Sequence, residues 1–242
     1  MGRADLDTLV DLLNVKWDRR VRIDSPGALV FHAFAHLLAE EAVADDVPLV
    51  YQEAMKLQAV YMLKLAPLAL GGAYPKGDGV LQGGRDLVVL RALDRTAKWL
   101  EARFGSVDPA GYQFGDVHVT SFADSFGRGI DSGTLPTNGG ETTLNVSPSV
   151  FYDADGAVAQ QWQSRFGPLV RTTGTFAEDG TPELWFNAPL GNVADPNSPH
   201  ASDWMSDWRD GRYRRFAYRK AEVDAKAESS YELVWERPGA VE

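Results

Sequence analysis

The hydrophobic pattern of this 242-residue chain changes its period once, close to Gly105. Up to that residue, apolar side chains recur every three or four positions, as on one face of an α-helix, and beyond it they alternate as in β-strands. Because helices precede strands instead of alternating with them, the sequence predicts an α+β fold with an antiparallel or mixed sheet. The prediction is one region, 1–242, with a helical part (1–105) and a mostly β part (106–242).

Local signals mark the ends of the expected helices. Ser25 suits the N-cap of the second helix, and Pro26 suits its first turn because proline has no N–H to leave unpaired there. Asp86 lies near the positive end of the fourth helix, and Gly105 suits its C-cap. The glycine-rich stretch 71–84 lacks the Gly-Lys-Ser/Thr of a phosphate-binding loop and is interpreted as a linker. The four predicted helices cover residues 7–13, 25–45, 51–70 and 85–104.

Short runs of β-prone residues follow Gly105, separated by turn-forming sequences. The turns are expected at 138–140, 153–156 and 178–180. The predicted strands cover residues 117–121, 142–146, 169–175, 183–188, 214–218 and 231–235.

Composition excludes several classes of function. The net charge of −10 argues against a nucleic-acid partner, which usually meets a basic face. The absence of cysteine excludes disulfides and thiolate metal sites in this chain. The most apolar stretch, 59–70, contains Lys64 and Pro67 and is too short to span a bilayer. The first residues lack the pattern of a signal peptide, and no cofactor is predicted.

Three residues form an alternative metal site. His32, His36 and Glu40 lie at i, i+4 and i+8, so one helix face carries all three, and such groups can bind a metal ion. No glutamate follows His32, so the zinc-protease pattern is absent. The favoured interpretation is therefore two histidines on a polar or boundary face of the helix.

A serine-hydrolase triad is not supported by spacing. The nearest string to the Gly-x-Ser-x-Gly motif, residues 129–133, places its serine wrongly. The candidate bases, His118 and His200, are expected to make structural hydrogen bonds. Asp203 can orient the His200 ring in a rigid, buried corner that begins at Ser198.

Tryptophans in the second half suggest a different class, a non-catalytic carbohydrate- or ligand-binding module. Trp185, Trp204 and Trp208 could stack on sugar rings. A role in the core or in an interface is the favoured interpretation of these three side chains.

Four groups of short sequence segments, which we call strings, occur in a defined order along the chain. They are Leu13–Arg19 with Asp24–Phe31, then Phe114–His118, then Gly139–Asn145, and last Leu190–Asp203 continuing to Trp208–Tyr213. In this order they resemble the penicillin acylase (penicillin amidase) family of N-terminal-nucleophile hydrolases, in particular its aculeacin and acyl-homoserine-lactone acylase branch. The chain departs from the family pattern where Phe114 replaces Trp, Asn192-Val193 replaces Gln-Ser, and Trp204 replaces Gln.

The resemblance implies the C-terminal portion of an αββα sandwich and hydrolysis of the amide of N-acylated β-lactams, lipopeptides or acyl-homoserine lactones. In the family, the nucleophilic serine, freed by self-cleavage, and the oxyanion-binding asparagine precede the matched region. No catalytic, cofactor or metal residue is therefore assigned here. The chain is expected to be a fragment beginning abruptly at Met1, inactive alone, that needs the N-terminal part of the β-chain and an α-chain. The resemblance also implies a periplasmic or secreted enzyme.

Overall fold

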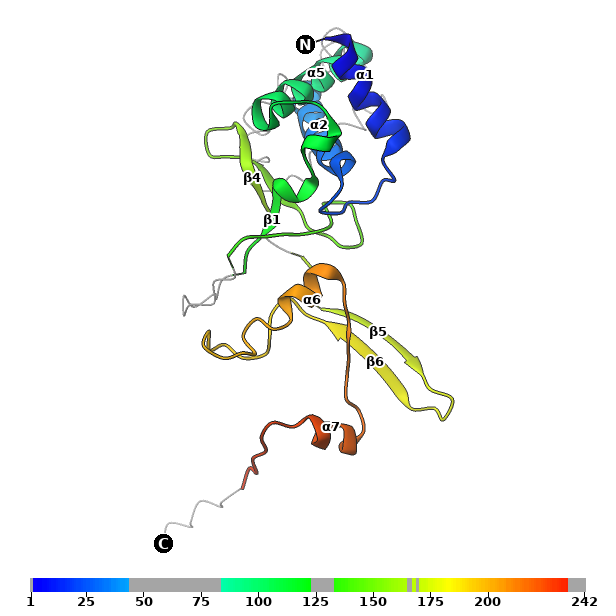
Figure 1. Cartoon of the computed structure of the whole chain (residues 1–242), viewed down its shortest axis with the longest axis vertical. Coiled ribbons are helices and arrows are strands. Elements are labelled where there is room, and N and C mark those ends of the chain that lie inside the picture. Colours follow the sequence, from blue (N-terminus) through cyan, green and yellow to red (C-terminus); the bar gives the residue numbers. More distant parts are fainter. Residues whose placement is uncertain (1, 44–83, 123–132, 165–166, 169, 235–242) are drawn as a thin grey trace. The chain divides into compact units, whose positions relative to one another are not determined.

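The computed structural model describes residues 2–43, 84–122, 133–164, 167–168 and 170–234 (Figure 1). The chain divides into two compact units. Unit 1 comprises Met1–Leu169 and Gly191–Asp203, and unit 2 comprises Val170–Leu190 and Trp204–Glu242. In the described residues, no helix is both long enough and apolar enough to span a membrane.

Helices form the first part of unit 1, as predicted. Helix α1 (Arg3–Asp11) continues into a π-helical turn, η1 (Leu12–Lys16), and is followed by α2 (Pro26–Val43) and α5 (Arg85–Phe104). Helix α5 has the predicted bounds and ends at Gly105, which has the left-handed φ of 76° expected of a C-cap. The predicted helix 51–70 and almost all of the linker 71–84 lie outside the described residues.

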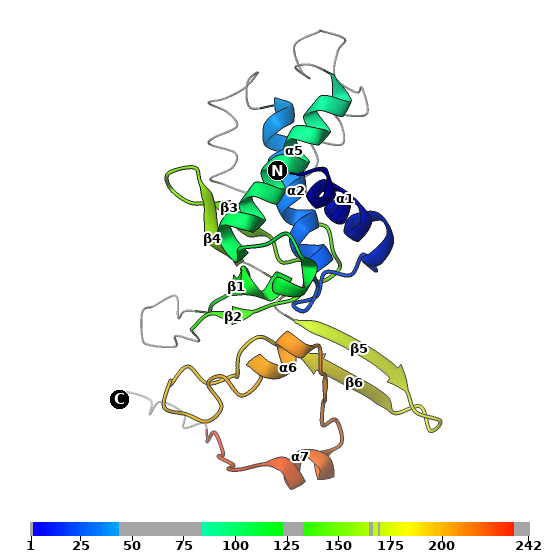
Figure 2. The ribbon, with the colours of Figure 1, turned by 45° about the horizontal axis from the view of Figure 1, so that its top comes forward.

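Helices α2 and α5 pack against each other along unit 1 (Figure 2), and both carry buried alanines. Short side chains let two helix backbones approach closely, because the interaxial distance depends on the residues at the contact. The buried alanines of the two helices are Ala28, Ala33, Ala39 and Ala42 in α2, and Ala92 and Ala97 in α5.

A four-stranded mixed sheet completes unit 1. Its strands are β1 (His118–Thr120), β2 (Leu135–Pro136), β3 (Ser149–Tyr152) and β4 (Val158–Ser164), in the order β2-β1-β4-β3. Strand β1 runs parallel to β4, and the other pairs are antiparallel, so the sheet is mixed as predicted. All three residues of β1 are buried, which shows that both of its faces are covered.

Aromatic side chains join the sheet of unit 1 to its helices. Trp162 of β4 is 1% exposed and stacks on Trp99 of α5, with ring centroids 5.5 Å apart. The ring of Phe151 on β3 also packs against Trp162, with ring centroids 4.9 Å apart. Burying large aromatic rings provides much of the apolar area on which a core depends.

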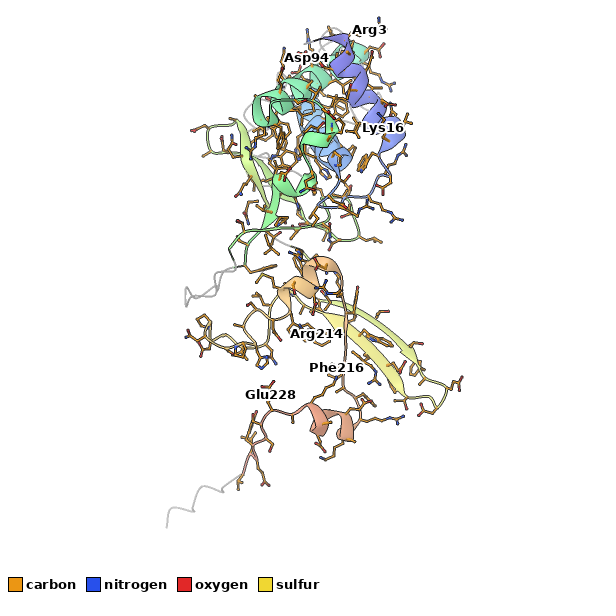
Figure 3. All side chains as sticks on the ribbon, viewed as in Figure 1. Arg3, Lys16, Asp94, Arg214, Phe216 and Glu228 are labelled. Carbon is orange, nitrogen blue, oxygen red and sulfur yellow. The ribbon has the colours of Figure 1, made fainter. Side chains whose placement is uncertain are left out.

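Unit 2 contains a three-stranded antiparallel sheet, with β6 (Pro182–Asn187) between β5 (Arg171–Phe176) and β7 (Arg214–Arg215). Two short helices, α6 (Met205–Asp210) and α7 (Lys220–Lys226), were not predicted. Arg214, labelled in Figure 3 beside Phe216, lies over the Trp204 ring at 4.4 Å.

Two predicted strands are wrong, and one hairpin was not expected. Residues 142–146 form a turn with one isolated bridge, and residues 231–234 form no strand. The β3–β4 hairpin was missed, although its turn at 153–156 was predicted.

Candidate functional site: a buried histidine–glutamate cluster

Three of the four groups of strings meet in unit 1. Backbone hydrogen bonds connect them directly: Phe114 N–H donates to Ser25 O (3.2 Å), and Gly115 N–H donates to Ile23 O (2.8 Å). Gly139 N–H donates to Val21 O at 2.9 Å. Segments that lie far apart in the sequence therefore form one site.

Glycines permit the closest of these approaches. A Cβ on Gly27 would lie 2.3 Å from Cγ of Trp17, and a Cβ on Gly140 would lie 2.5 Å from Nε2 of His32. Both distances are far below van der Waals contact, so only glycine fits at these two positions.

The string Gly139–Asn145 is a turn held by its own side chains. The Thr143 hydroxyl accepts from Gly140 N–H (3.0 Å) and donates to Asn145 O (2.7 Å). The Asn145 amide donates to Asn138 O at 2.7 Å. Side-chain bonds of this kind compete with strand pairing, which explains why the predicted strand 142–146 does not form.

Glu141 projects from this turn toward helix α2. Its side chain is 1% exposed, and its two oxygens lie 3.3 Å from His32 Nε2 and 3.7 Å from His36 Nε2. Burial acts to raise the pKa of Glu141, but contacts with the two imidazoles outweigh burial and hold the pKa well below its usual value. The carboxylate is thus a buried anion beside two histidines.

His32 is the imidazole that lies nearest to this carboxylate. Burial acts to lower its pKa, but the hydrogen bond and charge of Glu141 outweigh this, so the pKa is raised. Its other ring nitrogen, Nδ1, lies 2.8 Å from Ala28 O and is therefore placed to donate.

His118 lies next to this pair and is also buried. Its Nδ1 is 2.8 Å from Thr137 O, and its Nε2 is 3.0 Å from Ser147 O. Phe114 stacks on the ring, with centroids 4.5 Å apart. Burial lowers the pKa of His118, and hydrogen bonds to the two carbonyls oppose this effect. We call His32, His36, His118 and Glu141 the histidine–glutamate cluster.

The alternative metal site is not favoured. His32 and His36 share a face of α2, but Glu40 binds the Arg95 guanidinium at 2.7 Å and accepts from the Tyr152 hydroxyl at 3.0 Å. Within the part of the chain that the structure describes, no three His, Cys, Asp or Glu side chains are arranged to hold a metal ion. The expectation of a polar or boundary face was wrong, because His32 and His36 are buried.

The other candidate base, His200, has the predicted partner. Its Nδ1 lies 3.5 Å from a carboxylate oxygen of Asp203, and its backbone N–H donates to the Ser198 hydroxyl. The corner was expected to be buried, but the His200 and Asp203 side chains are 41% and 28% exposed. Residues 129–132 of the string 129–133 lie outside the described residues.

The tryptophans of unit 2 are mainly structural. Trp208 is buried beneath the Arg171 guanidinium, which lies 5.0 Å from its ring. Trp204 packs against Phe186 at 4.4 Å. Trp185 lies in the middle strand, β6, and is half-buried. The carbohydrate-binding alternative is therefore not favoured.

These features define an α+β protein in which three of the four groups of strings pack together around a buried histidine–glutamate cluster. A family model described as penicillin amidase matches residues 3–225, and the chain belongs to this family. Among solved structures, a thermostable penicillin G acylase from Alcaligenes faecalis has a similar fold, with a TM-score of 0.53 and 16% sequence identity. The alignment covers 98% of this chain and 44% of that chain, so this chain spans less than half of its structural relative. No protein with a curated description matches significantly.

Proposed function

We propose that this chain forms the C-terminal part of the β-chain of a penicillin-acylase-type amidohydrolase, which cleaves the amide between an acyl group and an amine. The match of the penicillin amidase model to residues 3–225 carries the proposal. The order of the strings supports it, since three of them pack together in unit 1.

In this proposal the described residues act as scaffold. The cluster connects helix α2, strand β1 and the Gly139–Asn145 turn through buried contacts. The serine nucleophile and the oxyanion-binding asparagine come from the preceding part of the β-chain, and an α-chain completes the enzyme. The enzyme acts in the periplasm or outside the cell.

The experiment compares the 242-residue chain alone with the same chain joined to its upstream coding segment. Chromogenic N-acyl amides are the substrates, and a serine-directed inhibitor is the control. We expect hydrolysis only from the joined protein, with the inhibitor abolishing it. Inhibitor-sensitive hydrolysis by the chain alone contradicts the proposal that the nucleophile comes from the preceding segment. A joined protein that carries a Gly-Ser cleavage site but is inactive contradicts the proposed amidohydrolase activity.

The substrate branch is a finer proposal, the aculeacin and acyl-homoserine-lactone acylase branch. It rests on the four groups of strings taken together. A series of amides from phenylacetyl to long aliphatic acyl groups tests it. Faster cleavage of the long aliphatic amides supports this branch, and a preference for phenylacetyl contradicts it.

A further inference from the structure

Two buried imidazoles have more acceptors around them than neutral rings can satisfy. His32 directs Nδ1 at Ala28 O (2.8 Å) and Nε2 at a Glu141 oxygen (3.3 Å). His118 directs its two nitrogens at Thr137 O (2.8 Å) and Ser147 O (3.0 Å). A neutral imidazole has one N–H, so both contacts of His118 are hydrogen bonds only when its ring is an imidazolium ion.

Charge limits how many protons the cluster holds at neutral pH. The charged groups that act on His118 from the described elements around it are His32 on α2, which opposes protonation, and Glu141 on the turn, which favours it. His36, also on α2, faces the second oxygen of Glu141. Two imidazolium ions beside one carboxylate would leave a net positive charge buried, which is costly. His32 touches the carboxylate and takes the first proton, which leaves His118 neutral.

A neutral His118 can still satisfy both of its nitrogens. Thr137 Oγ1 lies 3.4 Å from Nδ1, so this hydroxyl can donate to the nitrogen when it has no proton. Nε2–H then keeps its bond to Ser147 O, and the Thr137 carbonyl is released. Protonation at Nδ1 reverses the exchange and binds the carbonyl of Thr137 again.

We propose that His118 is a buried proton-binding site that holds the Thr137–Ser147 segment more tightly when it is protonated. The segment begins and ends on the same imidazole ring and carries Glu141 between these two points. Acidification therefore tightens the turn that contacts helix α2. The low pKa of His118 places this step below the usual histidine value of 6.5.

The test follows the full 242-residue chain, with 15N-labelled histidine, by NMR between pH 8 and pH 5. We expect His32 to keep its proton to a higher pH than His118 does, and His118 to change from neutral to imidazolium as the pH falls. Hydrogen-exchange protection of the Gly139 amide, corrected for the intrinsic effect of pH, should rise about tenfold in the same step, because hydrogen bonds to charged groups are the stronger ones.

Two variants assign the effect. His118→Gln should remove the pH-dependent change in protection, and the half-exposed His200→Gln should retain it. If His118→Gln does not fold, the NMR titration of His118 and the protection of the Gly139 amide in the wild type and in His200→Gln test the proposal. The proposal is overturned if His118 stays neutral down to pH 5 or is already an imidazolium at pH 8. It is also overturned if the exchange protection of the Gly139 amide does not change when His118 becomes protonated.

Discussion

Single atoms decide how the strings of unit 1 fit together, and Gly140 is the clearest case. Gly140→Ala would place a methyl group 2.5 Å from the His32 ring, so we expect a loss of about 2 kcal/mol in the free energy of unfolding. Gly111→Ala is the matched control, because a Cβ there meets nothing within 4 Å. Urea denaturation of both variants measures the difference, and equal stabilities would contradict the close approach.

Glu141 supplies the second residue-scale prediction. Glu141→Gln removes the anion facing His32, and breaking a buried ion pair costs about 3 kcal/mol. Glu41→Gln is the control, because its partner Arg95 is part-exposed and also binds Glu40, so the loss there should stay below about 1 kcal/mol. Chemical denaturation at pH 6 compares the variants.

The ion pair also predicts a pH window. Glu141 has a lowered pKa, so its contribution is present above the unfolded value of 4.5 and is lost as the pH falls through the folded pKa. His32 has a raised pKa, so its contribution is present below 6.5 and is lost as the pH rises through the folded pKa. The stability difference between wild type and Glu141→Gln should therefore be largest between pH 4.5 and 6.5. A difference that is constant from pH 3 to pH 9 would refute this assignment.

The sequence could predict only part of this site. Helical spacing correctly placed His32 and His36 on one face, but it selected Glu40 as their neighbour. The actual carboxylate, Glu141, lies more than a hundred residues away, and no local periodicity connects it to α2. Gly139-Gly140 before it was the available signal, since adjacent glycines favour close backbone approach.

At the scale of elements, the start of α2 depends on one hydroxyl. Ser25 Oγ accepts from Ala28 N–H at 3.1 Å, as an N-cap should. Ser25→Ala is expected to cost about 1 kcal/mol of unfolding free energy. Ser106→Ala removes a comparable bond from an exposed turn and should cost less. Thermal melts followed by circular dichroism measure both, and an unchanged Ser25→Ala melt would show that α2 does not depend on this cap.

Elements with local end signals were predicted best. Helix α5 matches residue for residue because Gly105 stops it and Asp86 suits its first turn. Strand β4 was missed because its sequence is largely polar, and Trp162 and Ser164 are its buried residues. Its existence depends on tertiary burial and on pairing with β1 and β3, which no short window of sequence contains.

At the scale of the whole molecule, the two units should unfold separately. The aromatic core around Trp162 belongs entirely to unit 1, while Trp208 and Asn187 are buried in unit 2. Trp162→Leu should lower one calorimetric transition, and Trp208→Leu should lower the other. A single transition that both substitutions shift equally would show that the chain unfolds as one cooperative unit.

The stacked indoles of Trp99 and Trp162 also make unit 1 optically distinct. Two such chromophores 5.5 Å apart couple their electronic transitions, so they should give a paired circular-dichroism band that isolated tryptophans lack. Because one ring belongs to α5 and the other to β4, the band exists only while helix and sheet are joined. The protein thus carries an intrinsic spectroscopic reporter of the packing on which its histidine–glutamate cluster depends.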